Sequence, residues 1–479
     1  MKVGGQFMNS QNLTWKFSKY FSEFNLGNVP IDVQELGKLL VLDTVACMAS
    51  GSKAAPAKQI HQVGTLFGGP GAVAEVGVPE LTGAVRAAYV NARIANLLDF
   101  DETYPVGVHF GIGAVAAAMS GVQVTQGNFG DLLCSAIAGY EAGARMASAI
   151  GPMMQVEDGV VKGFSRVWGV AAPVVIAACV AYGRALKIDD RTMHQAIAIA
   201  GSNIPLPIGS KWSDAKHLPD VKYCDAGWCA VTGIHGVESA LAGLSGFEDI
   251  LEGDSAIPQA YSAAMPDSAH LHEGLGERWH LEDITFKPWP TCRFMHQPMT
   301  ALNKILKIQE IKPEDIEEIT VFTGPLANSA RFRNPDPKTF ASHQFSYAHA
   351  CAMLALNVPV GADWFDPVVG NCELALSIRD KVKIELYEEG STFVQHMTLN
   401  QIRQMPGAAT VKTKAGEWHQ SSQFADGDPW NLENRYEKQR VTEKFIAAVP
   451  GKSSEDFCTW FWNADENSSV QELTTFLKG

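Results

Sequence analysis

The stretch NARIANLLDFDETYPVGVH, residues 91–109, joins an apolar, alanine-rich run to a cluster of acids and a histidine. Apolar residues recur at three- and four-residue spacing, which predicts a helix over residues 83–98 with one buried face. The acids at 99–102 follow it, and His109 comes after a proline-glycine turn. Carboxylates at the C-terminal end of a helix face its negative pole, which raises their proton affinity. This placement indicates a functional site, although the same acids could simply end a helix at the surface.

The composition is that of a globular protein with an acidic balance. A chain of 479 residues exceeds one ordinary core, so we expect two domains, with three as the alternative. Its 46% hydrophobic and 19% charged residues argue against disorder. With 38 basic and 52 acidic residues the formal charge is −14, which argues against nucleic acid or an anionic membrane as a partner. A small anionic substrate is still allowed, because a few local Lys and Arg residues decide its binding.

The cysteines and the N-terminus point to the cytoplasm. The nine cysteines are scattered without a C-x-x-C pair, which fits reduced thiols in a cytosol-like compartment. Cys224 and Cys229 lack the second pair or the histidine spacing of a metal site, so we interpret them as buried thiols. The first 15 residues carry no signal or transit pattern, and the longest apolar run, 170–182, is shorter than the roughly 20 residues of a membrane span. We expect a cytoplasmic protein without a membrane partner.

Helical spacing with interleaved small residues recurs through the first part of the chain. The expected helices cover residues 31–50, 83–98, 111–122, 129–150, 171–186, 191–202 and 227–244. Ala and Gly on their faces allow close packing of helix against helix. We predict one all-helical domain over residues 1–278, without a convincing strand.

The periodicity changes after a polar stretch at residues 266–278. Strands are expected at 284–289, 316–322, 383–387 and 410–414, and helices at 297–307 and 346–356. These elements predict a smaller α+β domain over residues 279–424. The motif GDPWN then interrupts the chain, and a helix over 432–448 begins the segment 425–479, which is expected to return to the first domain. The fold class is therefore mainly α, with an inserted α+β domain.

Two sequence clusters of the first domain carry polar groups next to a helix start. GFSRVWG, residues 163–169, places Ser165 before an apolar helix, and we favour a packed aromatic corner there. In KYCDAGW, Lys222 and Asp225 precede a long helix, whose first N–H groups favour an anion such as a substrate carboxylate. The alternative is that Asp225 caps the helix and Lys222 is solvated.

Two further clusters belong to the second domain. In FKPWPTCRFMH, two prolines imply a strand edge or a loop from which Lys287 and Arg293 project together. A guanidinium grips a carboxylate with two hydrogen bonds whereas an ammonium is a point charge, and a di- or tricarboxylate uses both. In ASHQFSY, Tyr347 could donate a proton, although a tyrosine at such a position is usually a core residue.

The motifs of metal and nucleotide enzymes are missing, which indicates an acid/base enzyme that uses side chains only. Taken together, and in this order along the chain, the clusters resemble the MmgE/PrpD family. The string LDFDET followed by a histidine is the most specific part of the resemblance.

The resemblance implies a large helical domain completed by the C-terminal segment, an α+β lid, and an active site in the cleft between them. It also implies a homodimer and no metal or organic cofactor. The positions that match functional residues of the family are Asp99, Thr103, His109, Lys222, Lys287 and Tyr347. Many relatives have a histidine where this chain has Ser165, Asp225 or Asn96, so a two-histidine mechanism does not carry over.

The chemistry that the family shares is proton transfer at a carbon next to a carboxylate. Such a carbon acid is weak, so fixed cations must stabilise the charge that spreads onto the carboxylate. We expect Lys222, Lys287 and Arg293 to supply them by binding a small di- or tricarboxylate.

The proton-transferring group is expected to be His109, since histidine titrates near neutral pH. Asp99 is expected to orient the ring and Thr103 to support it, with Tyr347 or Ser165 facing the leaving group. We favour dehydration of a 2-methylcitrate- or alkylcitrate-like hydroxy polycarboxylate, which needs one base and one acid. The alternatives are decarboxylation of a cis-aconitate-like acid, epimerisation of a dicarboxylate, and a non-catalytic carboxylate-binding protein.

Overall fold

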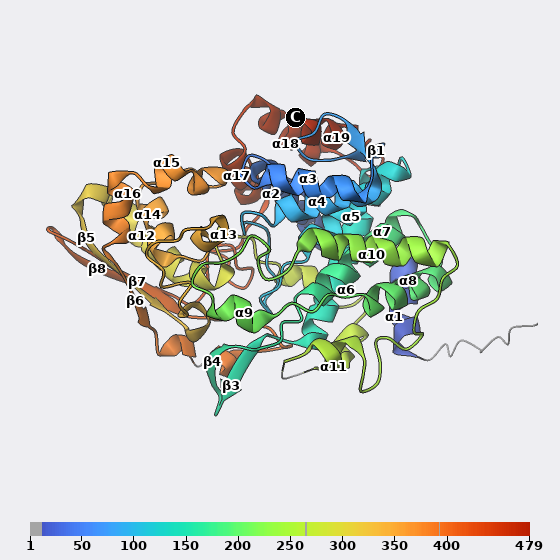
Figure 1. Ribbon diagram of the computed structural model, residues 1–479, viewed down its shortest axis with the longest axis horizontal. Helices are drawn as coiled ribbons and strands as arrows, with labels where there is room; N and C mark the ends of the chain where they lie inside the picture. The colour runs from blue at the N-terminus through green and yellow to red at the C-terminus, as the bar shows by residue number, and fades with distance from the viewer. Residues whose placement is uncertain (1–11, 264–265, 392) are drawn as a thin grey trace, which may run out of the picture.

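The computed structural model describes residues 12–263, 266–391 and 393–479, and within them the fold is mainly α, as predicted. Most helices of the first part form one body, drawn from blue to green in Figure 1. They are α1 (Leu13–Ser22), α2 (Ile31–Gly51), α3 (Ala57–Gly64), α4 (Ala84–Ala95), α5 (Gly111–Val124), α6 (Phe129–Ile150), α7 (Ala171–Ala185), α8 (Asp190–Ser202), α9 (Gly209–Asp214), α10 (Ala226–Leu241) and α11 (Ile257–Tyr261). The first 15 residues, in which we found no signal or transit pattern, lie mostly outside the described part, because it begins at residue 12.

Small residues bring the central helices into close contact. A Cβ atom on Gly139 of α6 would lie 2.6 Å from the carbonyl oxygen of Ala177 in α7, so only glycine fits there. A Cβ on Gly113 of α5 would lie 2.8 Å from the Val174 side chain of α7. Because α5, α6 and α7 are almost wholly buried, this close packing forms the centre of the molecule.

Two short hairpins interrupt this helical part, where we had expected no strand. One pairs β1 (Pro70–Ala74) with β2 (Leu81–Thr82), and the other pairs β3 (Met154–Glu157) with β4 (Val160–Phe164). The second turns at Asp158 and Gly159, which have φ of 52° and 75°. Asp-Gly between two short segments that contain valine is a hairpin signal, so the sequence did contain evidence for β3 and β4 that the helical pattern obscured.

The second part contains a four-stranded sheet in the order β6-β5-β7-β8. Its strands are β5 (Ile316–Thr323), β6 (Val382–Leu386), β7 (Gly407–Thr413) and β8 (Gly416–Ser422), of which only the pair β5 and β6 is parallel. Its helices are α12 (His296–Ile308), α13 (Phe340–His343), α14 (Tyr347–Ala355), α15 (Pro367–Gly370) and α16 (Glu373–Arg379). The sheet occupies the left of Figure 1, away from the helical body.

The strand expected at residues 284–289 does not form. Only Thr285 pairs, in an isolated bridge with Thr103 whose N–H···O distances are 2.9 and 3.1 Å. Pro288 and Pro290 lack the N–H groups that a longer ladder needs, so the chain continues as a loop. Lys287 therefore reaches the acid cluster from this loop and not from a strand of a sheet.

The C-terminal helices α17 (Lys438–Ala448), α18 (Lys452–Asn463) and α19 (Gln471–Lys478) lie beside the first helices of the chain at the top of Figure 1. Lys444 of α17 places its Nζ 2.5 Å from Oδ1 of Asp43 in α2. It also donates to the carbonyl oxygen of Phe100 at 2.8 Å, so the tail braces the acid-bearing loop. Throughout the described residues, every helix is too short or too polar to cross a membrane.

Candidate active site

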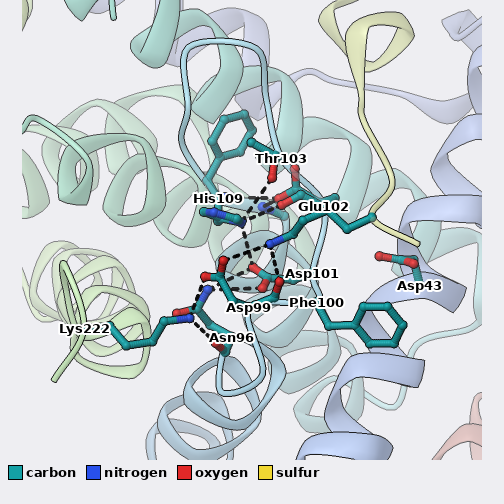
Figure 2. A network of polar contacts seen from close by, with 12 residues as sticks. Asp43, Asn96, Asp99, Phe100, Asp101, Glu102, Thr103, His109 and Lys222 are labelled. Atoms are coloured by element: carbon teal, nitrogen blue, oxygen red, sulfur yellow. Dashed lines mark hydrogen bonds and ion pairs between the residues drawn. The ribbon is translucent and has the colours of Figure 1, made fainter. Parts of the chain in front are cut away.

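The acid cluster lies in a buried loop that follows a helix, and this helix ends three residues before the predicted end at residue 98. Helix α4 ends at Ala95, and Asp99 has a left-handed backbone with φ of 54°, which turns the chain sharply. Asp99 is 1% exposed and Asp101 is fully buried, so the alternative of a solvated helix end is wrong. Figure 2 shows that the loop gathers these acids, His109 and Lys222 into one network.

Asp99 is held between two buried lysines. Nζ of Lys222 lies 2.7 Å from Oδ1 of Asp99 and 2.7 Å from the carbonyl oxygen of Asn96. Nζ of Lys287 donates to the Asp99 carbonyl oxygen and lies 3.3 Å from its Oδ2. Burial alone would raise the pKa of Asp99, but the two ammonium groups hold this pKa well below its usual range. Asp99 therefore stays ionised, and its charge compensates one of the two lysine charges.

His109 is anchored through a single ring nitrogen. Its Nδ1 lies 2.8 Å from the carbonyl oxygen of Glu102, 3.3 Å from Oδ2 of Asp101 and 3.4 Å from Oγ1 of Thr103. The ring of Tyr223 stacks on the imidazole with centroids 5.7 Å apart. Because a carbonyl oxygen can only accept, Nδ1 carries the hydrogen, and Nε2 is the basic nitrogen that a bound molecule can meet.

The acid beside His109 is Asp101, whereas we had expected Asp99 to orient the ring. The left-handed turn at Asp99 directs its carboxylate to the lysines, and Asp101 takes the place beside Nδ1. Although burial acts to raise the pKa of Asp101, the neighbouring His109 lowers it below the usual value. Both Asp101 oxygens also accept from Nδ2 of Asn96, at 3.0 and 3.2 Å. Asp101 is thus a fixed carboxylate next to the imidazole.

Glu102 secures the other side of the loop. Its Oε1 accepts the backbone N–H groups of Phe110 at 3.1 Å and Gly111 at 2.6 Å, at the start of α5. Burial, and then repulsion from Asp101, raise the pKa of Glu102 to about 8, although the two N–H groups act against this. Glu102 therefore holds the N-terminus of α5 against the loop that carries His109.

These groups border a cavity with a mixed lining. His109, Asp99 and Thr103 form part of its wall, and two guanidinium groups, Arg293 and Arg331, form another part. The remaining lining is mainly aromatic and apolar and consists of Gly107, Met153, Phe164, Trp168, Val170, Trp212, Tyr223, Cys292, Phe294 and Phe345. An imidazole base facing two cations suits an anionic molecule that also has an apolar part.

Comparison with known proteins places the chain in one family. Residues 16–268 match the MmgE/PrpD N-terminal domain, and residues 289–457 match the MmgE/PrpD C-terminal domain. The chain belongs to the MmgE/PrpD family. It is 26% identical over 305 residues to a cis-aconitate decarboxylase of Aspergillus terreus (strain NIH 2624 / FGSC A1156) and 25% identical over 305 residues to a second one from Aspergillus terreus. Each alignment covers 61% of this chain and 60% of the relative.

Within this MmgE/PrpD chain, four of the predicted site residues line the cavity: Asp99, Thr103, His109 and Arg293. Lys222 and Lys287 reach the same network from behind Asp99 and do not border the cavity. Lys222 is 4% exposed, so the alternative that it is a solvated side chain is wrong. Asp225 does cap α10, where its Oδ1 accepts the N–H of Trp228 at 3.0 Å.

Two predicted residues lie outside the cavity wall. The hydroxyl of Tyr347 is fully buried and lies 2.7 Å from Oγ1 of Thr323. Ser165 follows Phe164, which does line the cavity, and its carbonyl oxygen accepts Nε1–H of Trp168 at 2.7 Å. In this structure neither hydroxyl borders the space in front of His109.

The sequence reasoning missed Arg331, which lies next to three phenylalanine rings. Its guanidinium carbon lies 5.1 Å from the ring centre of Phe164, 4.8 Å from that of Phe332 and 5.8 Å from that of Phe345. Only its own neighbour Phe332 could have been anticipated, because the other two rings come from distant segments. In the described residues, no group of three or more His, Cys, Asp or Glu side chains is arranged to hold a metal ion.

Proposed function

We propose that this protein is a lyase that needs no cofactor and acts by proton transfer at a carbon next to a carboxylate. The observation that carries the proposal is the placement of His109 at the cavity wall, with Nδ1 bound to the Glu102 carbonyl oxygen and Nε2 left as the base. Asp101 stabilises the imidazolium that forms when Nε2 takes a proton. The family and its cis-aconitate decarboxylase relatives support a lyase.

The substrate is proposed to be a small di- or tricarboxylate. Arg293 and Arg331 line the same cavity as His109, and guanidinium groups bind carboxylates in a planar, two-point geometry. Lys222 and Lys287 contribute a positive potential from behind Asp99, whose carboxylate compensates one of their two charges, and neither lysine borders the cavity. We therefore assign direct carboxylate contacts to the arginines, with the lysines in a supporting role.

Dehydration of a 2-methylcitrate- or alkylcitrate-like acid is the reaction that we favour. Nε2 of His109 removes the proton next to the carboxylate, and the electron pair of that C–H bond forms the double bond. The C–O bond to the neighbouring hydroxyl then breaks, and the imidazolium returns its proton so that water leaves. This cycle needs one residue as base and acid in turn, which fits a cavity that neither Tyr347 nor Ser165 borders.

Decarboxylation of a cis-aconitate-like acid is the second candidate, supported by the similarity of the chain to two cis-aconitate decarboxylases. In that reaction the bond to one carboxylate carbon breaks, carbon dioxide leaves, and His109 in its protonated form gives a proton to the carbon left behind. The two reactions differ in their products, because only decarboxylation releases carbon dioxide.

Incubation in D₂O with citrate, 2-methylcitrate, cis-aconitate, malate and iminodisuccinate, followed by proton NMR and headspace carbon dioxide, tests the proposal. New vinylic signals without carbon dioxide support dehydration, carbon dioxide supports decarboxylation, and exchange with inversion supports an epimerase. Silence across the panel while the acids still bind would reject the enzyme in favour of a carboxylate-binding protein.

Replacement of His109 with alanine tests the role of the base. We expect turnover to fall by about 10²- to 10⁴-fold, because the general base is lost. His61→Ala, which removes the half-buried partner of Glu75 outside the cavity, is the matched control. Activity of His109→Ala within a few-fold of wild type would remove His109 from the mechanism.

We also infer a homodimer in the cytoplasm. The family resemblance supports the dimer, and nine cysteines without a disulfide support a reducing compartment. Sedimentation equilibrium should give twice the mass of one chain.

A further inference from the structure

The cavity in front of His109 shares a wall with a second cavity. Thr103, Gly107, Arg293 and Phe294 line both of them, whereas His109 lines only the first. A molecule that reaches across these four residues would therefore have one end near the base and the other end in a separate space.

The residues that line only the second cavity are of mixed character. Ile402, Met405, Trp430, Tyr104 and Pro105 contribute mainly apolar surface, and Thr285 and Gln297 are polar. Ile402 and Met405 belong to a small apolar cluster against which Phe294 packs. The backbone N–H of Ile402 donates to the carbonyl oxygen of Pro105 at 2.6 Å, which fixes this wall to the loop that carries Thr103. Burial of each methylene group against such a lining should raise the affinity of a ligand by about fourfold.

Phe294 lies at the boundary that the two cavities share. A Cβ atom on Gly107 would lie 2.9 Å from Cζ of Phe294, and Gly107 has a left-handed φ of 83°, so this contact requires glycine on both counts. The Phe294 ring also meets the edge of Phe164, with centroids 5.5 Å apart. The ring is only half-buried, unlike its chain neighbours Arg293 and Met295.

Arg293 marks where a carboxylate would sit at this boundary. One of its terminal nitrogens pairs with Asp428, which also accepts from Thr285 and the N–H of Ala425. Its other terminal nitrogen, Nη1, has no hydrogen-bond partner among the described residues, although Arg293 is only 8% exposed. A buried donor without a partner is costly, and a ligand carboxylate would satisfy it.

We propose that the second cavity receives an apolar substituent of the polycarboxylate substrate and that Phe294 limits the length of this substituent. The substrate carboxylate binds Nη1 of Arg293, the reacting carbon faces His109, and the substituent passes Phe294 toward Ile402 and Met405. The proposal rests on the function proposed above, because it concerns the same substrate, and it adds the residue that selects its alkyl group.

Titration calorimetry with succinate, methylsuccinate and butylsuccinate tests this without turnover. Phe294→Ala joins the two spaces, so the affinity for butylsuccinate should rise relative to methylsuccinate by about tenfold or more. Adding Ile402→Trp to this variant fills the second cavity and should return the ratio to the wild-type value. Should Phe294→Ala unfold, Phe294→Leu is measured instead, with a smaller shift in the same direction.

Phe345→Ala is the matched control, because Phe345 lines the first cavity only. It should leave the ratio of the two affinities unchanged. The proposal is overturned if Phe294→Ala shifts both ligands equally, or if Phe345→Ala changes the ratio as much. Selective binding without any exchange in D₂O would reject the lyase and keep the substituent pocket, whereas turnover with an unchanged ratio would reject the pocket alone.

Discussion

Two aspartates two positions apart have different tasks in this site. Asp99 compensates the charges of Lys222 and Lys287, and Asp101 lies beside Nδ1 of His109. Both are buried, which acts to raise their pKa values, yet each pKa lies below the ordinary value, because Lys222 and Lys287 act on Asp99 and the neighbouring His109 acts on Asp101. At the residue scale, the partner of each carboxylate rather than its exposure decides its role.

Asp101→Asn should reduce turnover while the fold is kept. The amide is nearly isosteric with the carboxylate, but it cannot stabilise the imidazolium that forms on His109. We expect kcat to fall by about 10²-fold, with the melting temperature within a few degrees of wild type. Steady-state kinetics together with circular dichroism checks this, and an unchanged kcat would remove Asp101 from the mechanism.

At the scale of elements, α5 and α17 hold the acid-bearing loop from two sides. Glu102 accepts the first N–H groups of α5, and Lys444 of α17 donates to the carbonyl oxygen of Phe100. Irregular backbone in a buried loop needs partners for its polar groups, and these two residues supply some of them. The loop therefore depends on an N-terminal and a C-terminal helix together.

Glu102→Gln should make the free energy of unfolding fall less as the pH rises from 6 to 8. The pKa of Glu102 is raised from 4.5 to about 8, so the folded state holds a proton that the unfolded state releases above pH 4.5. Stability from this group is therefore complete below pH 4.5 and is lost as pH rises toward 8. Glutamine stays neutral, so between pH 6 and 8 the variant should lose less unfolding free energy than wild type, by on the order of 2 kcal/mol.

Urea unfolding at pH 6, 7 and 8 measures this difference. Glu472→Gln, on the exposed face of α19, is the control and should follow wild type. Parallel pH profiles for wild type and Glu102→Gln would show that Glu102 is not protonated in the folded state.

Lys444→Met should loosen the C-terminal helices. The change leaves Asp43 buried without a counter-charge and the Phe100 carbonyl oxygen without its donor. Breaking a buried ion pair from one side costs about 3–5 kcal/mol. Urea unfolding checks this, with the exposed Lys452→Met of α18 as the control, which should stay within about 0.5 kcal/mol. Equal midpoints for the two variants would contradict the bracing role.

At the scale of the whole molecule, the candidate site joins parts of the chain that are far apart in sequence. Asp99, Lys222 and Lys287 meet in one ion cluster, and the cavity beside it adds Arg293 and Arg331. The cluster thus links the segment matched by the N-terminal family domain to the loop just before the C-terminal one. We therefore expect a change that weakens this ion cluster to destabilise the whole fold.

Asp99→Asn should therefore destabilise the entire protein. The amide leaves two buried ammonium groups without a full counter-charge, which costs about 3–5 kcal/mol. Asp189→Asn is the control, because Asp189 is exposed and asparagine caps α8 as well as aspartate does, so little change is expected. Urea unfolding followed by fluorescence separates the two, and a loss under about 1 kcal/mol for Asp99→Asn would contradict the structural role of the cluster.

The sequence by itself determined the mainly helical fold, because apolar and small residues recur at helical spacing in α5, α6 and α7. It also singled out His109, Asp99, Thr103 and Arg293, which all line the cavity, since chemically distinctive residues stand out in an apolar context. It did not predict the β3–β4 hairpin, where the local Asp-Gly signal was outweighed by the surrounding helical pattern.

Only the tertiary structure decided which partner each charged group has. The left-handed turn at Asp99 directs its carboxylate to Lys222 and Lys287, so both lysines lie behind the cavity wall and do not line it. Asp101, not Asp99, therefore lies beside His109. Arg331 lies in the cavity wall, where Phe164 and Phe345 from distant segments pack against its guanidinium group. The spacing of apolar residues along a chain indicates which face of a helix is buried. The partner of a buried charged group depends on contacts between segments that are far apart in the sequence, and this spacing does not predict them.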